Sequence, residues 1–192
     1  MFVRLNLPLS MLRAAAPVLI AAALSAKPAA AQYYWFPQQT KQDTTALAAA
    51  RKTPMQLKGT AMDGRVVDLA KLRGKPVAIE FWALSDCDDC VSEQAAVKAV
   101  YDKYHSKGFE VIRIVMEADT ANKTLIEKAA KENGITWPQL YDGKGRQNEF
   151  ATKYLVSDLP KLFMLSKKGT LTANEVSPTD LESYVTAALA GN

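Results

Sequence analysis

Two cysteines are the residues of this chain best suited to chemistry. Cys87 and Cys90 are its only thiols, and just two residues separate them in "SDCDDC". A disulfide between them would close a loop of about four residues, which is too short to stabilise a fold well through loop-closure entropy. Reactivity explains the spacing better, because one thiolate can attack a disulfide and the second can resolve the mixed disulfide that forms. A structural or zinc-binding pair is the alternative, although zinc normally takes four ligands and His105 is the only other soft candidate.

Three carboxylates lie beside these cysteines: Asp86, Asp88 and Asp89. At ~7 Å and an effective dielectric of ~40, each would disfavour a neighbouring thiolate by about 1 kcal/mol. A less stable thiolate makes the reduced form less stable and the disulfide relatively favoured. The acidic setting therefore predicts a low-potential pair, a reductant rather than a strong oxidant, although Asp88 and Asp89 would equally suit the first turn of a helix.

Two apolar patterns predict the elements that position the cysteines. The run "KPVAIEFWA" (75–83) is nearly continuous, as expected of a central strand covered on both faces. Apolar residues then recur at helical spacing from Asp88 to about His105, ahead of Gly108. Cys87 would lie at the N-terminus of this helix, where unpaired N–H groups and the helix dipole favour a thiolate, and Cys90 would lie deeper, one turn along.

The rest of the chain alternates strands with helices and closes with an antiparallel pair. The patterns predict a hairpin over 55–72, strands at 109–117 and 135–142, helices at 120–133 and 146–156, a hairpin over 161–176, and a last helix over 178–190 that opens with "SPTD". This order predicts an α/β fold with a mixed central sheet and helices on both faces.

The first 31 residues have the composition of an export signal. They carry Arg4 and Arg13, then the apolar run "AAAPVLIAAALSA" (14–26), and "AAA" at 29–31. The pattern predicts a signal peptide cleaved after Ala31 and export to the periplasm. An uncleaved anchor would need ~20 apolar residues, and Pro17 interrupts the run. Without this segment, 21 basic and 20 acidic residues give a net charge of +1, so no bulk electrostatic force draws the protein to nucleic acid or anionic membranes.

We predict a linker over 32–53 and one globular domain over 54–192. Near its start the linker carries an aromatic cluster whose role the sequence does not reveal: Tyr33, Tyr34, Trp35 and Phe36. A short helix is predicted around Thr45–Arg51. The remaining chain is long enough, and with 48% hydrophobic residues apolar enough, to bury one sizeable core.

Several motifs together resemble the thioredoxin fold. "EFWA" on a strand, followed by Cys-x-x-Cys at the opening of a helix, is similar to the thioredoxin active site, and "YLVSDLPKLFMLSKKGTL" (154–171) resembles the segment that carries a cis-proline before an edge hairpin. "GTAMDGRVVDLAKLRGKPVAIEFWA" and "GITWPQLYDGKGRQNEFATKYLV" resemble the TlpA- and ResA-related branch, itself related to AhpC/TSA. Members of that branch are exported thiol–disulfide oxidoreductases with an N-terminal hairpin and an inserted α/β element. The resemblance covers residues 54–190.

The resemblance implies roles for further residues. Glu80 matches a buried carboxylate that passes a proton to or from the resolving thiol; the alternative is a structural carboxylate paired with Lys75 or Lys161. Pro160 would be the cis-proline beside the disulfide, and the backbone of Leu159 would pair with an extended substrate segment. Trp82 matches the strand tryptophan of the family and would pack against and shield the site.

The resemblance also implies partners. These are proteins with thiols or disulfides, and a membrane thiol reductase that returns electrons to the pair; cytochrome c maturation is the process that such exported proteins often serve. No cofactor is expected beyond a redox-active Cys87–Cys90 disulfide.

One departure from the family keeps other functions open. Three residues separate Ala83 from Cys87, where the family usually has two with tryptophan second. The additional residue would bulge the loop and shift Cys87 relative to the helix. The alternatives are a catalytically weakened binding module or a thiol peroxidase, although the Pro–Thr–Cys arrangement of peroxidases is absent. Copper handling through the two thiols is a further alternative without a positioned histidine.

Overall fold

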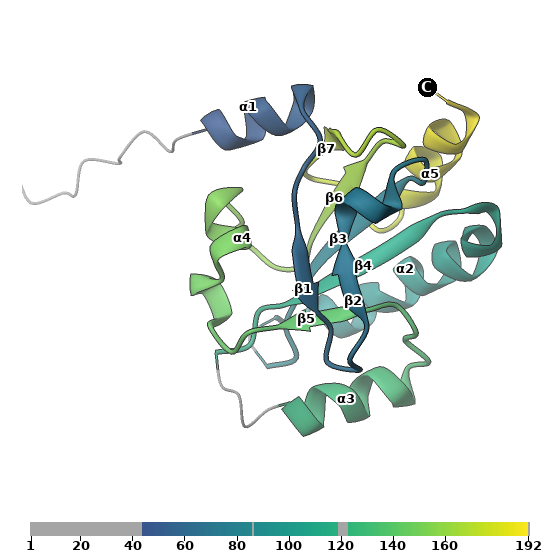
Figure 1. Ribbon diagram of the computed structural model, residues 1–192. Coiled ribbons are helices and arrows are strands. Elements are labelled where there is room, and N and C mark those ends of the chain that lie inside the picture. The colour runs from purple at the N-terminus through teal and green to yellow at the C-terminus, as the bar shows by residue number, and fades with distance from the viewer. Residues whose placement is uncertain (1–43, 86, 119–122, 192) are drawn as a thin grey trace, which may run out of the picture. The chain divides into compact units, whose positions relative to one another are not determined.

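The computed structural model describes residues 44–85, 87–118 and 123–191 (Figure 1). Spatial contacts divide the chain into Met1–Thr40 and Lys41–Asn192, and all described residues belong to the second unit. The predicted signal peptide, the aromatic cluster at 33–36 and Asp86 lie outside the described residues. Within the described ranges, no helix combines the length and the apolar character needed to cross a bilayer.

A five-stranded mixed sheet forms the centre of the fold, in the order β5-β4-β3-β6-β7. Its strands are β3 (Val77–Trp82), β4 (Glu110–Val115), β5 (Gln139–Tyr141), β6 (Lys161–Leu165) and β7 (Leu171–Ala173). Strands β3, β4 and β5 are parallel to one another, β6 is antiparallel to β3, and β7 is antiparallel to β6. The predicted mixed sheet is confirmed.

Strand β3 is the central element because it pairs with β4 on one side and β6 on the other. All six of its residues are buried, as its continuous apolar run predicts. Alternation along the strand sends Val77, Ile79 and Phe81 to one face of the sheet. The opposite face, against which the helix after the cysteines packs, carries Ala78, Glu80 and Trp82.

The face bearing Phe81 is covered by the N-terminal hairpin and two helices. The hairpin consists of β1 (Lys58–Thr60) and β2 (Val66–Asp68), and the helices are α1 (Thr45–Lys52) and α4 (Glu149–Lys153). Each element contributes to one apolar core: α1 through Ala50, β2 through Val67, and α4 through Ala151. Figure 1 shows the hairpin lying across the sheet.

Helix α1 falls within the segment predicted as a linker, and it packs on the domain. Ala50 is buried in the core. Arg51 donates hydrogen bonds to the Thr172 carbonyl (3.4 Å) and the Asn174 side chain (2.7 Å) at strand β7. The predicted short helix is confirmed, and its contacts attach it to the edge of the sheet.

The opposite face is covered by α2 (Cys90–Tyr104), α3 (Lys123–Glu132) and α5 (Leu181–Ala190). Val97 and Tyr101 of α2, Ala130 of α3 and Val185 of α5 are buried against it. The predicted helices on both faces are confirmed, and α3, β5 and α4 lie between β4 and β6 in the chain. The described residues also include short 3₁₀ turns at Leu69–Leu72, His105–Lys107 and Gly145–Gln147.

Helices α4 and α5 differ from their predicted limits for local reasons. The last helix begins at Leu181, because "SPTD" forms a turn in which the Asp180 N–H donates to the Ser177 carbonyl at 2.9 Å. Of the predicted helix over 146–156, only α4 is α-helical, and a 3₁₀ turn precedes it. It ends early because Leu155 takes a left-handed φ of 59°, which an α-helix cannot continue through.

Candidate active site

The two cysteines form a disulfide at the start of α2. Their sulfur atoms are 1.97 Å apart and their Cα atoms 5.4 Å apart. Cys87 is partly exposed, whereas only 1% of Cys90 is accessible, in the order that the sequence predicts. The helix begins at Cys90 with Asp89 as its N-cap, so the prediction of a helix from Asp88 with Cys87 at its N-terminus is wrong. The residues from Cys87 to Asp89 form a turn that precedes the helix.

Cys90 is held beneath the end of β3. The Trp82 indole N–H donates to the Cys90 carbonyl at 3.0 Å, and the Ala83 N–H lies 3.5 Å from the Cys90 sulfur. Val115 and Ile126 complete the apolar surroundings of this pair. Trp82 thus positions the first turn of α2, and the sulfur of Cys90 meets a backbone donor inside the protein.

Glu80 forms a buried ion pair with Arg113. The two residues are opposite each other in the parallel register of β3 and β4. Arg113 donates to both carboxylate oxygens of Glu80, from Nε at 2.8 Å and from Nη2 at 3.2 Å. Only 2% of Glu80 and none of Arg113 is accessible, so each charge is compensated by the other inside the sheet.

The suggested lysine partners of Glu80 are therefore wrong. Lys75 pairs with Glu110 at 2.7 Å, and Lys161 pairs with Glu175 at 3.2 Å. Lys75 precedes the buried strand, and Lys161 is the first residue of β6. Their ammonium groups reach carboxylates near the surface, whereas strand register brings Arg113 directly beside Glu80.

Arg113 extends the Glu80 pair toward the cysteines. Its guanidinium carbon lies 4.4 Å from the centroid of the Trp82 ring and 5.5 Å from that of Trp137, a favourable cation–π arrangement. Trp82 in turn donates to Cys90. Arg113 was not among the predicted site residues, although a lone charge inside the apolar run "EVIRIVM" is the signal for a buried, paired residue.

The peptide bond between Leu159 and Pro160 is cis, as predicted. Leu159 and Cys87 both pack against the small core cluster that contains Trp82 and Cys90. Trp82, Leu159 and both cysteines therefore meet in one cluster at the end of β3 where α2 begins. Their chemical roles stay predictions.

A cavity of about 330 Å³ lies beside the cis-proline. Glu93 lines it from α2 and Pro160 from the position just before β6, together with Glu175 and Pro178. Burial raises the pKa of Glu93, and the negative charge of Asp89 raises it further. Glu93 was not among the predicted site residues, although its position one helical turn after Cys90 is the signal that links it to the site.

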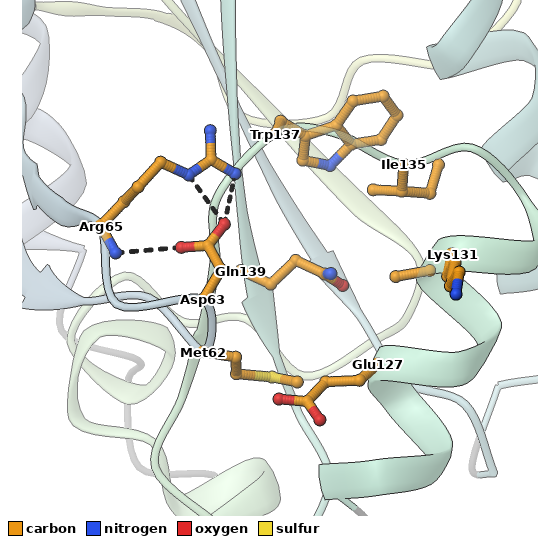
Figure 2. Close-up of a pocket in the computed structure, with 9 residues that line it drawn as sticks. Met62, Asp63, Arg65, Glu127, Lys131, Ile135, Trp137 and Gln139 are labelled. Carbon is orange, nitrogen blue, oxygen red and sulfur yellow. Dashed lines mark hydrogen bonds and ion pairs between the residues drawn. The ribbon is translucent and has the colours of Figure 1, made fainter.

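A second cavity, of about 320 Å³, lies between the β1–β2 turn and α3 (Figure 2). Arg65 donates from Nε to Asp63 at 2.7 Å on its rim, and this hydrogen bond lowers the pKa of Asp63. Met62 and Trp137 also line it. None of the predicted site residues does, so this cavity belongs to another surface of the domain.

Among the described residues, no group of three or more metal-binding side chains is close enough to hold a metal ion. His105 lies beyond the C-terminal end of α2, with Nδ1 3.2 Å from the Phe109 carbonyl. Asp88 and Asp89 are exposed beside the cysteines.

The sheet is mixed, a Cys-x-x-Cys disulfide lies at the start of a helix, and the residue before a cis-proline packs in the same apolar cluster as the cysteines. These features define a thioredoxin-like protein of the thiol–disulfide oxidoreductase class. The chain belongs to the Redoxin family, whose model matches residues 39–189.

Named relatives agree with this class. The chain is 30% identical over 130 residues to the thiol–disulfide oxidoreductase ResA of Bacillus thuringiensis, covering 66% of this chain and 70% of that protein. It is 26% identical over 110 residues to the sporulation thiol–disulfide oxidoreductase A of Bacillus subtilis, covering 57% of this chain and 64% of that protein. A thiol:disulfide interchange protein from Chlorobium tepidum shares the fold, with a TM-score of 0.59, 22% identity, and coverage of 71% of this chain and 96% of that one.

Proposed function

We propose that this protein reduces or exchanges disulfides in other proteins through Cys87 and Cys90. The observation that carries the proposal is the disulfide between a partly exposed Cys87 and a buried Cys90. A substrate can reach the first sulfur, and the second is held within bonding distance of it. The relatives named as thiol–disulfide oxidoreductases support the same activity.

The proposed cycle has two exchange steps. In the reduced protein, the Cys87 thiolate attacks a substrate disulfide, forms a mixed disulfide and releases one substrate thiolate. The Cys90 thiolate then attacks the Cys87 sulfur and releases the second substrate thiolate. The substrate gains two electrons and, at neutral pH, two protons, and the protein is left with the Cys87–Cys90 disulfide. An external dithiol returns the two electrons.

The neighbouring residues support these steps in the proposal. Glu80 accepts the proton from the Cys90 thiol when that thiol becomes the attacking group. The backbone of Leu159 pairs with the substrate chain, and Pro160 holds that chain over Cys87. Trp82 keeps the first turn of α2 beneath β3 through its bond to the Cys90 carbonyl.

The potential of the pair is proposed to be low. Asp88 and Asp89 are exposed beside Cys87, and their charges oppose the thiolate. Titration against glutathione buffers tests this property. A midpoint near that of strongly oxidising proteins such as DsbA, about −120 mV, would contradict it.

We also propose that the protein acts after export, in the periplasm. The first 31 residues have the composition of a signal peptide. A membrane thiol reductase would then supply electrons, and apocytochrome c thiols are the candidate substrates. Mass spectrometry of the protein from a periplasmic fraction tests the export, and a mass that retains residues 1–31 would contradict cleavage.

Insulin reduction tests the exchange activity. The wild type, kept reduced by dithiothreitol, should accelerate insulin reduction, and Cys87→Ser should abolish that acceleration. Cys90→Ser should trap a mixed disulfide at Cys87, because the resolving sulfur is missing. A wild type with no effect on insulin would favour the binding module, and consumption of peroxide by the reduced protein would favour the peroxidase.

A further inference from the structure

Glu117 is a buried carboxylate that the exchange steps above do not use. It lies two residues beyond the end of β4, and only 3% of it is accessible. Its Oε1 accepts the backbone N–H groups of Leu84 at 2.5 Å and of Ser85 at 2.7 Å, and its Oε2 accepts the Ser85 hydroxyl at 2.7 Å. Three donors from two consecutive residues therefore converge on one side chain.

Those donors belong to the link between β3 and Cys87. This is the segment with one residue more than the thioredoxin pattern. It has left the β3 ladder and has not yet entered α2, so its N–H groups have no regular secondary structure to pair with. A partly buried N–H without an acceptor is costly. Glu117 supplies that acceptor with a charge-assisted hydrogen bond, which is stronger than a neutral one.

The main chain on each side of Glu117 is itself anchored. The preceding Met116 N–H donates to the Trp82 carbonyl at 2.7 Å, and the Glu117 carbonyl accepts from the Gly145 N–H at 3.0 Å. Gly145 has a φ of 54°, and a Cβ there would lie 2.9 Å from the Cβ of Ala118. The close approach of this turn fixes the backbone from which the carboxylate reaches the link.

We infer that Glu117 is a positioning residue, which holds the Leu84–Ser85 link so that Cys87 stays within bonding reach of Cys90. The inference rests on the proposed function, because it concerns the reactivity of that pair. Its consequence is thermodynamic. A link held in place raises the effective concentration of the Cys87 thiol at Cys90, so it favours the disulfide over the reduced pair.

Glu117→Gln tests the inference. An amide keeps the shape, but it presents an NH₂ group to donors that need an acceptor. The equilibrium constant for forming the Cys87–Cys90 disulfide from glutathione disulfide should fall about tenfold, or about 30 mV for a two-electron couple. Removal of the negative charge would shift the constant in the same direction, so a second variant has to separate positioning from charge.

Ser85→Ala makes that separation. It removes one donor and leaves the Glu117 carboxylate and both backbone bonds. Positioning predicts a fall of about threefold in the same equilibrium constant, the size of one weak hydrogen bond. Charge alone predicts no change. An unchanged constant in Ser85→Ala overturns the inference, even if Glu117→Gln is too unstable to measure.

Glu110→Gln is the matched control. Glu110 is the first residue of β4, at the end of the strand away from Glu117, and it pairs with Lys75 at 2.7 Å. The same chemical change there should leave the glutathione constant at the wild-type value. Urea unfolding of all variants shows whether stability alone follows the redox change. Equal shifts in Glu110→Gln and Glu117→Gln would contradict a positioning role.

The glutathione measurement also separates this inference from the proposed function. A wild type that equilibrates with glutathione but leaves insulin unreduced contradicts the protein-disulfide activity and still permits the comparison of variants. A wild type that reduces insulin, with variants that match it in the glutathione constant, contradicts only the role of Glu117.

Discussion

Two buried carboxylates of this oxidoreductase are satisfied in opposite ways. Glu80, in the interior of the sheet, is neutralised by the guanidinium of Arg113. Glu117, at the strand end, accepts neutral N–H and O–H donors from the link before Cys87. In the sheet, one charged side chain is compensated by another. In the loop, a carboxylate accepts hydrogen bonds that hold the backbone in place. We therefore expect loss of the Arg113 partner of Glu80 to lower the free energy of unfolding, and changes at Glu117 to shift the redox equilibrium of the cysteine pair.

The largest expected effect comes from breaking the ion pair in the sheet. Arg113→Met leaves Glu80 buried without its partner, and the free energy of unfolding should fall by about 3–5 kcal/mol. Urea denaturation measures this loss. The double variant Glu80→Leu/Arg113→Met removes both charges and should recover most of it. A loss below about 1 kcal/mol in the single variant would show that the pair is not what compensates Glu80.

A smaller effect is expected on the loop side from Gly145→Ala. The new Cβ would contact Ala118, and the alanine would have to adopt a left-handed backbone conformation. The free energy of unfolding should therefore fall by about 1–3 kcal/mol. Displacement of Glu117 should also lower the glutathione equilibrium constant. Gly64→Ala is the control, because its φ of 87° is equally unfavourable but nothing lies within 4 Å of the new atom. A shift of the same size in the glutathione equilibrium constant of Gly64→Ala would contradict a specific effect of Gly145→Ala through Glu117.

The smallest expected effect concerns Glu93, a carboxylate that belongs to neither arrangement. Its pKa is raised above 4.5 by burial and by Asp89, so the folded state binds its proton more tightly than the unfolded state. The resulting stabilisation is complete below the unfolded pKa and is lost as pH rises through the folded pKa. Glu93→Gln should remove this dependence and change stability by no more than about 0.5 kcal/mol, as most surface substitutions do.

Glu149→Gln is the control for Glu93→Gln, because Glu149 should make stability depend on pH in the opposite direction. The hydrogen bond from Lys144 lowers the pKa of Glu149. Its stabilisation is therefore present above the unfolded pKa and is lost as pH falls through the folded pKa. Urea unfolding at acidic and neutral pH measures both slopes. Slopes of the same sign for the two carboxylates would contradict the assignment for Glu93.

The fold was predictable because its signals are local. The continuous apolar run of β3 indicated a strand buried on both faces, and helical spacing indicated α2. The cis bond before Pro160 came from the resemblance to the thioredoxin family, since an X–Pro bond does not reveal its isomer by itself. The limits of α2 and α5 were wrong because the Asp88–Asp89 and Ser177–Asp180 turns compete with the helix at its first residues.

The partners of the buried charges were not predictable in the same way. Arg113 is 33 residues from Glu80 in the chain, and only the register of two parallel strands places them together. Glu117 reaches Ser85 across a similar separation. A crossover connection leaves no local trace of that register, so the sequence indicates that a buried charge needs a partner without indicating which one.

Both outer strands of the sheet already use main-chain acceptors that a foreign strand would need. At β7, Arg51 of α1 donates to the Thr172 carbonyl, and at β5, the Met62 N–H of the hairpin turn donates to the Gln139 carbonyl at 2.9 Å. Unprotected edges invite strand addition and aggregation between molecules. A foreign polypeptide is thereby discouraged from extending the sheet at either of these two edges.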